Sequence, residues 1–193
     1  AANPLPNPGF EEGAGRWAID EDVSRVVPEA ARTGNLGLRV GAERYNPAGS
    51  SVTSARLPVV PGREVSLTFW ARSKTATCGV YLFFYNAAGK TVGTVVLVAP
   101  RGYSSNIQML VGVDGELKVK GIKVLDQRET PGLGTNILKA KFLGQFVGKS
   151  SADKLEPKKD VEAITGATIS TRGVCEGVRA ALAGASEFAQ GAK

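Results

Sequence analysis

The clearest periodic pattern of hydrophobic positions lies near the C-terminus of the chain. Apolar side chains recur there at i, i+4, i+7, i+8, i+11 and i+14, and the residues are Val174, Val178, Ala181, Leu182, Ala185 and Phe188. This spacing predicts one face of an amphipathic helix over about residues 171–190. Ser170 or Thr171 is the expected N-cap, because a hydroxyl can accept a hydrogen bond from a free N–H of the first turn.

Alternating apolar and polar positions predict β-strands, which Gly, Pro and Asn turns separate. The segments with this character are 65–72, 79–86, 91–98, 106–114 and 115–127. After the last of them, residues 128–134 predict a rigid loop, because proline fixes one φ and glycine allows unusual φ values. Residues 136–146 show a loose helical spacing of apolar residues, and we expect 149–159 to be a lysine-rich linker.

The strands of the first half suggest a β-sandwich. Segment 79–86 carries Tyr81, Phe83 and Tyr85 on one face, and large apolar residues also occupy its other face. In segment 65–72, Trp70 lies opposite the apolar face. One face of these strands is therefore core, and the other is either a second packing layer or an aromatic platform.

Composition changes near residue 98, which predicts two modules. The chain has eight Arg and two Lys up to that point, but four Arg and ten Lys after it. Nine of the thirteen aromatic residues also lie in the first part. With 193 residues, the chain is long enough for two small domains.

Charge and residue usage narrow the possible functions. The net charge of +6 comes with no basic tract, which argues against nucleic acid as a partner. We expect no transmembrane segment, since no apolar run approaches roughly 18 residues. The absence of histidine removes the commonest general base and metal ligand. Cys78 and Cys175 have no metal-ligand spacing, so we expect two buried free thiols and no metal site.

The stretch "AITGATIST" (163–171) surrounds a Gly-Ala pair with hydroxyls immediately before the predicted helix. Free N–H groups and the helix dipole favour an anion such as phosphate at that place. Thr168 lies on the turn, and the small Gly166 and Ala167 would let a bulky group approach its hydroxyl. The alternative is a helix cap that binds nothing.

Two motifs in order strengthen the first interpretation. The segments "RGYSSNIQMLVGVDGELKVKGIKVLDQRETPGLG" and "DVEAITGATIS" resemble the FMN-binding domain of the G subunit of Rnf complexes and of the C subunit of the sodium-pumping NADH:quinone reductase, over about residues 92–188. In that family, the Thr of a D-x-x-[ST]-G-A-T motif carries FMN through a phosphoester that a flavin transferase makes.

The resemblance implies that Thr168 is the FMN acceptor. Glu162 takes the acidic position, where the family has Asp. The other cofactor-binding residues that we predict are Thr165, Gly166, Ala167, Ser170, Glu129, Thr130, Pro131, Gly132, Leu133 and Gly134.

The first half carries a second resemblance. "NPGFEEG" (7–13), Trp17, "GLRV" (37–40) and residues 60–90 are similar to jelly-roll carbohydrate-binding modules, over about residues 3–92. In that family, aromatic side chains stack against sugar rings. The resemblance implies a carbohydrate-binding role for Trp70, Tyr81, Phe83 and Tyr85.

Together, these patterns predict a jelly-roll-like β-sandwich over residues 1–92 and a small α+β FMN-binding domain over residues 93–193. The function that we expect is covalently flavinylated electron transfer outside the cytoplasm, in the periplasm or at the cell surface, by a carrier domain rather than a stand-alone enzyme. Expected partners are a flavin transferase, redox proteins that include membrane electron-transport subunits, and polysaccharide. The alternative is a non-catalytic carbohydrate-binding protein with a structural C-terminal domain.

Overall fold

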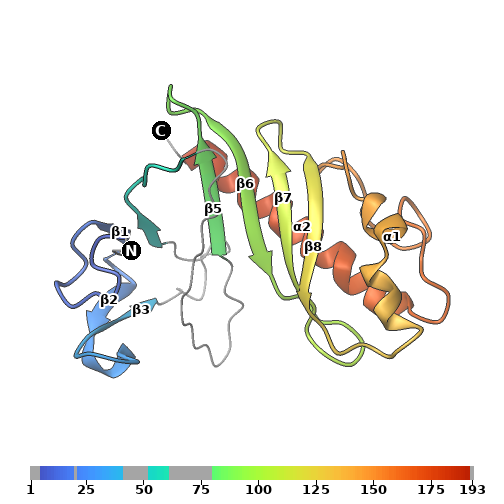
Figure 1. Cartoon of the computed structure of the whole chain (residues 1–193), viewed down its shortest axis with the longest axis horizontal. Coiled ribbons are helices and arrows are strands. Elements are labelled where there is room, and N and C mark those ends of the chain that lie inside the picture. The colour runs from blue at the N-terminus through green and yellow to red at the C-terminus, as the bar shows by residue number, and fades with distance from the viewer. Residues whose placement is uncertain (1–4, 20, 41–51, 61–79, 192–193) are drawn as a thin grey trace. The chain divides into compact units, whose positions relative to one another are not determined.

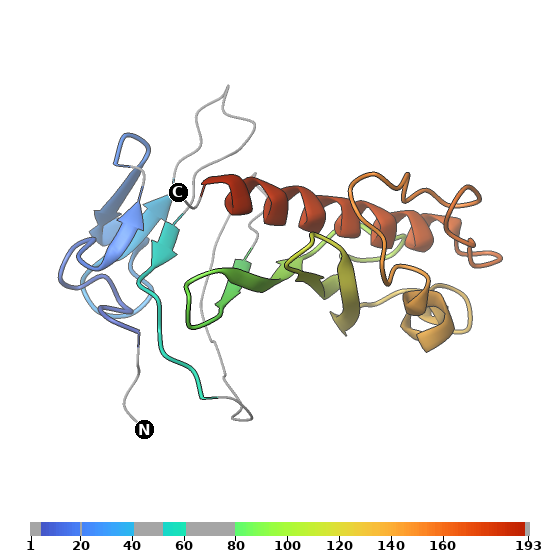
Figure 2. The same cartoon turned by 90° about the horizontal axis from the view of Figure 1, so that it is seen from above.

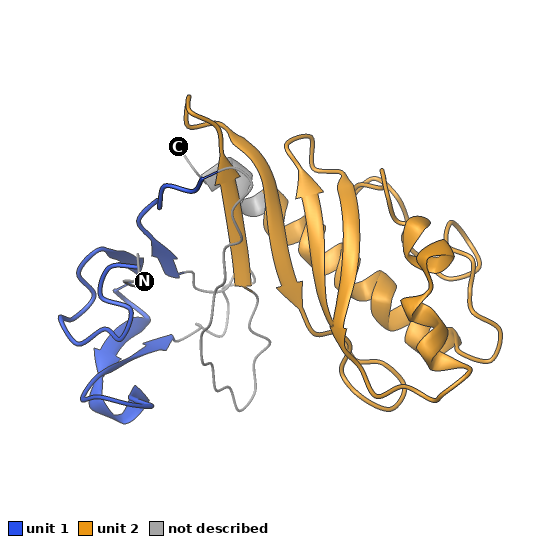
Figure 3. Cartoon of the chain, viewed as in Figure 1, with its two compact units in different colours: residues 1–72 blue, residues 73–193 orange. Residues whose placement is uncertain are grey.

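The chain divides into two compact units, residues 1–72 and 73–193 (Figure 3). The computed structural model describes residues 5–19, 21–40, 52–60 and 80–191. We predicted a boundary after residue 92, which is later in the chain than the division that the contacts define. The difference arises because residue 92 lies within the strand of residues 91–98, which pairs with the strand of residues 80–85 in the sheet of the second unit.

The first unit contains two short antiparallel pairs among its described residues. Strand β1 (Trp17–Ile19) pairs with β4 (Val52–Ser54), and β2 (Ser24–Val27) pairs with β3 (Gly37–Val40), which the 3₁₀ helix η1 (Pro28–Ala30) precedes. The jelly-roll sandwich is therefore not confirmed. The predicted strand 65–72, with Trp70, lies outside the described residues.

The second unit is built on a four-stranded antiparallel sheet (Figure 1). Its strands follow the chain in the order β5 (Val80–Tyr85), β6 (Thr91–Val98), β7 (Gln108–Asp114) and β8 (Val119–Asp126). The structure thus confirms the strands predicted within 79–86, 91–98, 106–114 and 115–127. Asp114 closes the β7–β8 turn, because its Oδ1 accepts hydrogen bonds from the N–H groups of Glu116 and Lys118.

Helix α2 (Thr168–Gly191) lies along one face of this sheet (Figure 2). The predicted apolar face of the helix is confirmed as far as Ala185, since Val174, Val178 and Leu182 are buried against Met109 and Val111 of the sheet. The free Cys175 is buried on the same helix, and burial raises the pKa of its thiol to about 12. Cys78 lies outside the described residues.

Strand β5 contributes Tyr81 to the packing around this core. The Tyr81 ring packs against the core, next to Gly184 of α2, and stacks on Phe83 with ring centroids 6.3 Å apart. On the opposite face, Leu82 and Phe84 are 39% and 42% exposed. Tyr81 therefore belongs to a packing layer between sheet and helix.

Two short helices connect β8 to the rest of the second unit. The 3₁₀ helix η2 (Gly134–Leu138) is followed by α1 (Ala140–Gly144), and an extended Lys139 separates them. The apolar residues behind the predicted helical spacing, Ile137, Phe142 and Phe146, are all buried. The spacing thus indicated burial correctly, although one continuous helix does not form.

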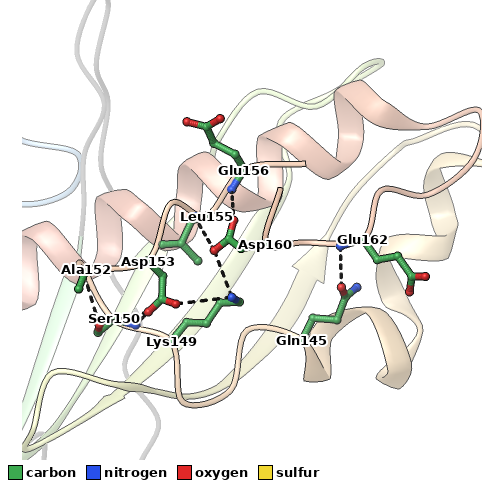
Figure 4. A network of polar contacts seen from close by, with 9 residues as sticks. All are labelled: Gln145, Lys149, Ser150, Ala152, Asp153, Leu155, Glu156, Asp160 and Glu162. Carbon is green, nitrogen blue, oxygen red and sulfur yellow. Dashed lines mark hydrogen bonds and ion pairs between the residues drawn. The ribbon is translucent and has the colours of Figure 1, made fainter. Parts of the chain in front are cut away.

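The prediction of a linker at 149–159 is wrong. Asp160 accepts hydrogen bonds from the N–H groups of Leu155 and Glu156, at 3.0 and 2.8 Å, and an ion pair joins it to Lys149 (Figure 4). Leu155 and Val161 are buried in the core. The lysines of this segment suggested an exposed linker. The contacts of the Asp160 carboxylate instead hold the segment against the core.

The described residues include no helix of the length and apolarity needed to span a lipid bilayer. They also bring together no group of three or more Cys, Asp or Glu side chains that would suit a metal ion.

Candidate functional site

The motif predicted to carry a cofactor forms a tight turn that leads directly into α2. The Ala167 N–H donates to the Ile164 carbonyl at 2.9 Å, and Gly166 has φ +76°. A positive φ at the third position is typical of a type II turn and favours glycine. Thr165 and Gly166 are exposed at the tip of this turn. The chain therefore presents a small, open turn at the start of a long helix.

Helix α2 begins at Thr168, so the predicted N-cap at Ser170 or Thr171 is wrong. Both hydroxyls instead lie in the first turn and are buried. The Thr171 hydroxyl donates to the Ala167 carbonyl at 3.0 Å and accepts from the Ile164 N–H at 3.2 Å. Thr171 thus fixes the turn to the helix that follows it.

Thr168 is half-buried at the first position of α2. In the described part of the chain, no protein group forms a hydrogen bond with its hydroxyl. The sequence had suggested that Ala167 borders an open approach to this hydroxyl. Ala167 is instead buried, with 6% of its surface exposed. The Thr168 hydroxyl is therefore available to a ligand, beside N–H groups that the first turn of a helix leaves without intrahelical partners.

A buried carboxylate organises the loops around this turn. Glu129 is 4% exposed. Its oxygens accept hydrogen bonds from the N–H groups of Tyr103, Ser104 and Ser105 at 2.9–3.1 Å. The Ser170 hydroxyl donates to Glu129 Oε2 at 2.5 Å. One carboxylate thereby joins the loop before β7, the loop after β8 and the first turn of α2.

Burial acts to raise the pKa of Glu129, but the hydrogen bonds from Ser170 and the three backbone N–H groups outweigh it and lower the pKa. Glu129 is therefore charged at neutral pH although it is buried. Hydrogen bonds to a charged carboxylate stabilise that form, in the way that a cation would.

The predicted rigid loop at 128–134 has the expected construction. The Thr130 carbonyl accepts from the N–H groups of Leu133 and Thr135, both at 3.2 Å, and Gly132 has φ +72°. Gly134 is required for another reason: a Cβ there would lie 2.7 Å from Glu129 Cβ. The loop is thus held by its own hydrogen bonds and by close packing on Glu129.

The two predicted cofactor segments meet. A Cβ on Gly166 would lie 3.1 Å from Leu133 Cδ2, so the Leu133 side chain approaches the exposed turn. The second connection is the Glu129–Ser170 hydrogen bond. Thr130, Pro131 and Leu133 are exposed beside these contacts. Segments whose contacting residues lie 33 to 41 positions apart in sequence therefore form one surface.

Glu162 lies to one side of this surface. Its side chain is exposed, while its N–H donates to Gln145 Oε1 at 2.7 Å (Figure 4). This contact borders a groove with a volume of about 230 Å³. The groove is lined by Asn136, Lys139, Lys141, Phe142, Gln145, Glu162, Ala163 and Ile164.

These features suit a phosphorylated cofactor. A free hydroxyl stands at the N-terminus of a 24-residue helix, where the dipole favours negative charge. The turn beside it is open, and a groove lined by apolar residues and by charged residues of both signs lies next to the same segment.

The comparisons with known proteins point to the same cofactor. Residues 102–183 match the family of FMN-binding domains. This part of the chain is therefore similar to FMN-binding domains. The matched residues contain the Glu129 cluster, the rigid loop and the Thr168 turn.

Relatives of the domain belong to ion-translocating complexes. The G subunit of the proton-translocating ferredoxin:NAD(+) oxidoreductase complex of Clostridium ljungdahlii is 39% identical over 108 residues, which cover 53% of this chain and 58% of that protein. The G subunit of the ion-translocating oxidoreductase complex of Aliivibrio fischeri is 41% identical over 113 residues, 53% of each chain. The chain thus spans about half the length of the curated relatives it matches.

A solved structure is also similar. NqrC of Shewanella oneidensis has a TM-score of 0.43 and 26% identity, over 51% of this chain and 52% of that chain.

Sequence reasoning missed three parts of this surface. The N–H groups of residues 103–105 were not among the predicted site residues, although the loop belongs to the matching motif. Thr171 was expected only as a cap, and the groove residues of η2 and α1 were expected only as helix. The one sequence signal for the N–H groups of residues 103–105 was Glu129, the acidic residue at the start of the Gly/Pro loop.

Proposed function

We propose that this chain carries FMN covalently, through a phosphoester to Thr168, and serves as an electron carrier. The observation that carries the proposal is the free, half-buried Thr168 hydroxyl at the first position of α2, within the FMN-binding domain. Bound FMN supplies the redox chemistry, because flavins accept and release electrons singly or in pairs.

The residues around Thr168 hold and orient such a group. The first turn of α2 offers backbone N–H groups and a favourable dipole for the phosphate. Gly166 keeps the approach to the hydroxyl open, and Thr171 prevents the turn from moving relative to the helix. Glu129 holds the loop of residues 130–134 next to the same turn.

The attachment reaction is balanced when FAD is the FMN donor and a flavin transferase is the catalyst. Thr168 Oγ1 forms a bond to the phosphorus of the FMN half, the bond between the two phosphates breaks, AMP leaves, and the hydroxyl proton is released. No histidine is needed in this chain, because the transferase supplies the catalytic groups.

We infer the partners and the location from the same chemistry. The relatives named above belong to ion-translocating oxidoreductase complexes, which makes a redox subunit of such a complex the proposed electron donor or acceptor. A location outside the cytoplasm, in the periplasm or at the cell surface, is part of the proposal.

The test is mass spectrometry of protein that is co-expressed with a flavin transferase. We expect the mass to rise by one FMN residue, and Thr168→Ala to abolish the increase because it removes the acceptor oxygen. Ser151→Ala is the matched control, since Ser151 is an exposed hydroxyl outside the motif. Peptide mapping that places FMN on Thr165, or an unmodified wild-type protein, would contradict the proposal.

A further inference from the structure

The groove beside the motif has a lining that the attachment of FMN alone does not require. Its lining includes the 5%-exposed Phe142 of α1, together with Ile164. Lys139, Lys141 and Glu162 also line it and are exposed. Small-molecule sites typically combine an apolar bed with a few placed polar groups.

Two amides of the groove are fixed and keep hydrogen-bonding capacity. Gln145 Oε1 accepts from the Glu162 N–H at 2.7 Å, and Asn136 Nδ2 donates to the Gly132 carbonyl at 2.8 Å. A side-chain amide has both donor and acceptor atoms, so Gln145 retains its NH₂ group and Asn136 its carbonyl oxygen. The edge of a flavin ring system needs such partners, because it carries carbonyl oxygens and an N–H.

The groove is continuous with the attachment turn along the chain. Glu162, Ala163 and Ile164 line it, and Ile164 is the first residue of the turn that ends at Ala167. The same Ile164 donates its N–H to Thr171. The groove is therefore held in a fixed relation to the first turn of α2.

We propose that this groove receives the isoalloxazine ring of the flavin carried by Thr168, with Lys139 and Lys141 acting as positioning residues that raise its reduction potential. The proposal rests on the proposed function. Phe142 and Ile164 offer the apolar bed, and Gln145 and Asn136 offer polar atoms for the ring edge. Reduction adds negative charge to the ring system, and nearby ammonium groups stabilise that charge.

Charge removal tests the role of the lysines. The double variant Lys139→Met/Lys141→Met is compared with wild type and with Lys120→Met/Lys154→Met, which removes two exposed lysines outside the groove. We expect the groove variant to lower the midpoint potential by about 30 mV, a tenfold change in a two-electron equilibrium. The control pair should change it much less, and Lys139→Arg/Lys141→Arg should restore the wild-type value.

Proximity is tested separately. A tryptophan close to a flavin quenches its fluorescence, so Lys141→Trp should lower FMN emission several-fold, whereas Lys154→Trp should not. Mass spectrometry of each variant shows whether FMN is attached, and melting temperature shows whether the domain is folded.

The outcomes separate the two proposals. If wild type takes up no FMN, the proposed function is wrong and the groove assignment falls with it. If FMN is attached but the groove and control variants have equal potentials and equal emission, the ring lies elsewhere and only the groove assignment is overturned.

Discussion

At the scale of single residues, Glu129 has the most far-reaching contacts of the candidate site. It is a buried charge with which no described Lys or Arg forms an ion pair, and three N–H groups and the Ser170 hydroxyl stabilise it. Because hydrogen bonds to charged groups contribute roughly 1.5–3 kcal/mol, we expect Glu129→Gln to lower the free energy of unfolding by about 1–3 kcal/mol at pH 7. Urea unfolding measures this difference.

The same residue predicts a pH dependence. The pKa of Glu129 is lower in the folded protein than the ordinary value of 4.5, so its contribution is present in full above that value. It is lost as the pH falls through the folded pKa. The difference between wild type and Glu129→Gln should therefore shrink in acid. A pH-independent difference would contradict a charged Glu129.

A substitution of Tyr81 tests whether this side chain belongs to the core or to a sugar-binding platform. Its ring packs against the core beside Gly184, so truncation leaves a cavity. We expect Tyr81→Ala to destabilise the protein by about 3 kcal/mol, and the exposed Leu82→Ala by clearly less. Thermal melting, together with retention on xylan or glucan, is the measurement. Unchanged melting with loss of retention would instead support the carbohydrate-binding hypothesis.

At the scale of elements, segment 149–161 is held by a few carboxylate contacts rather than by a regular helix or strand. Burial acts to raise the pKa of Asp160, but the N–H groups of Glu156 and Leu155 and the Lys149 ammonium lower it to about 2. Because the ordinary value is 3.8, this contribution to stability is present above that pH and is lost as the pH falls toward 2.

We expect Asp160→Asn to cost on the order of 1–2 kcal/mol and to speed amide hydrogen exchange in this segment first. Asp153→Asn should cost less, because the Asp153 side chain is 36% exposed against 23% for Asp160. Equal exchange rates in wild type and Asp160→Asn would show that the network does not hold the segment.

At the scale of the whole molecule, charge is divided unequally. Residues 73–193 contain 16 Lys and Arg and 10 Asp and Glu, whereas residues 1–72 contain eight of each. The entire net charge of +6 therefore belongs to the unit that contains the match to FMN-binding domains. A positive domain attracts an acidic partner over the Debye length.

Electron transfer to an acidic protein should accordingly be fast at low ionic strength. Its rate should fall as the salt concentration rises from about 0.01 M to 1 M. Stopped-flow oxidation of the reduced, flavinylated protein by succinylated cytochrome c measures this effect, because succinylation makes that protein acidic. Native cytochrome c is basic and serves as the control with the same haem. A faster reaction with the native form at low salt would contradict a steering role for the charge.

The sequence by itself determined the strands β5–β8, the apolar face of α2 and the motif that resembles FMN-binding domains. These follow from local information, since side-chain periodicity reports which face of an element is buried. The net charge of +6 is likewise a property of the sequence, whereas its assignment to residues 73–193 uses the division that the structure gives.

Only the tertiary structure decided where α2 begins, that residues 149–161 are folded, and that Glu129 joins three segments. The start of α2 depends on Thr171 bonding back to the turn, and the folded segment depends on Lys149 reaching Asp160. Glu129 bonds to groups 24 to 41 residues away. A buried carboxylate is stable only with such partners, and no pattern of neighbouring residues shows which distant N–H groups will supply them.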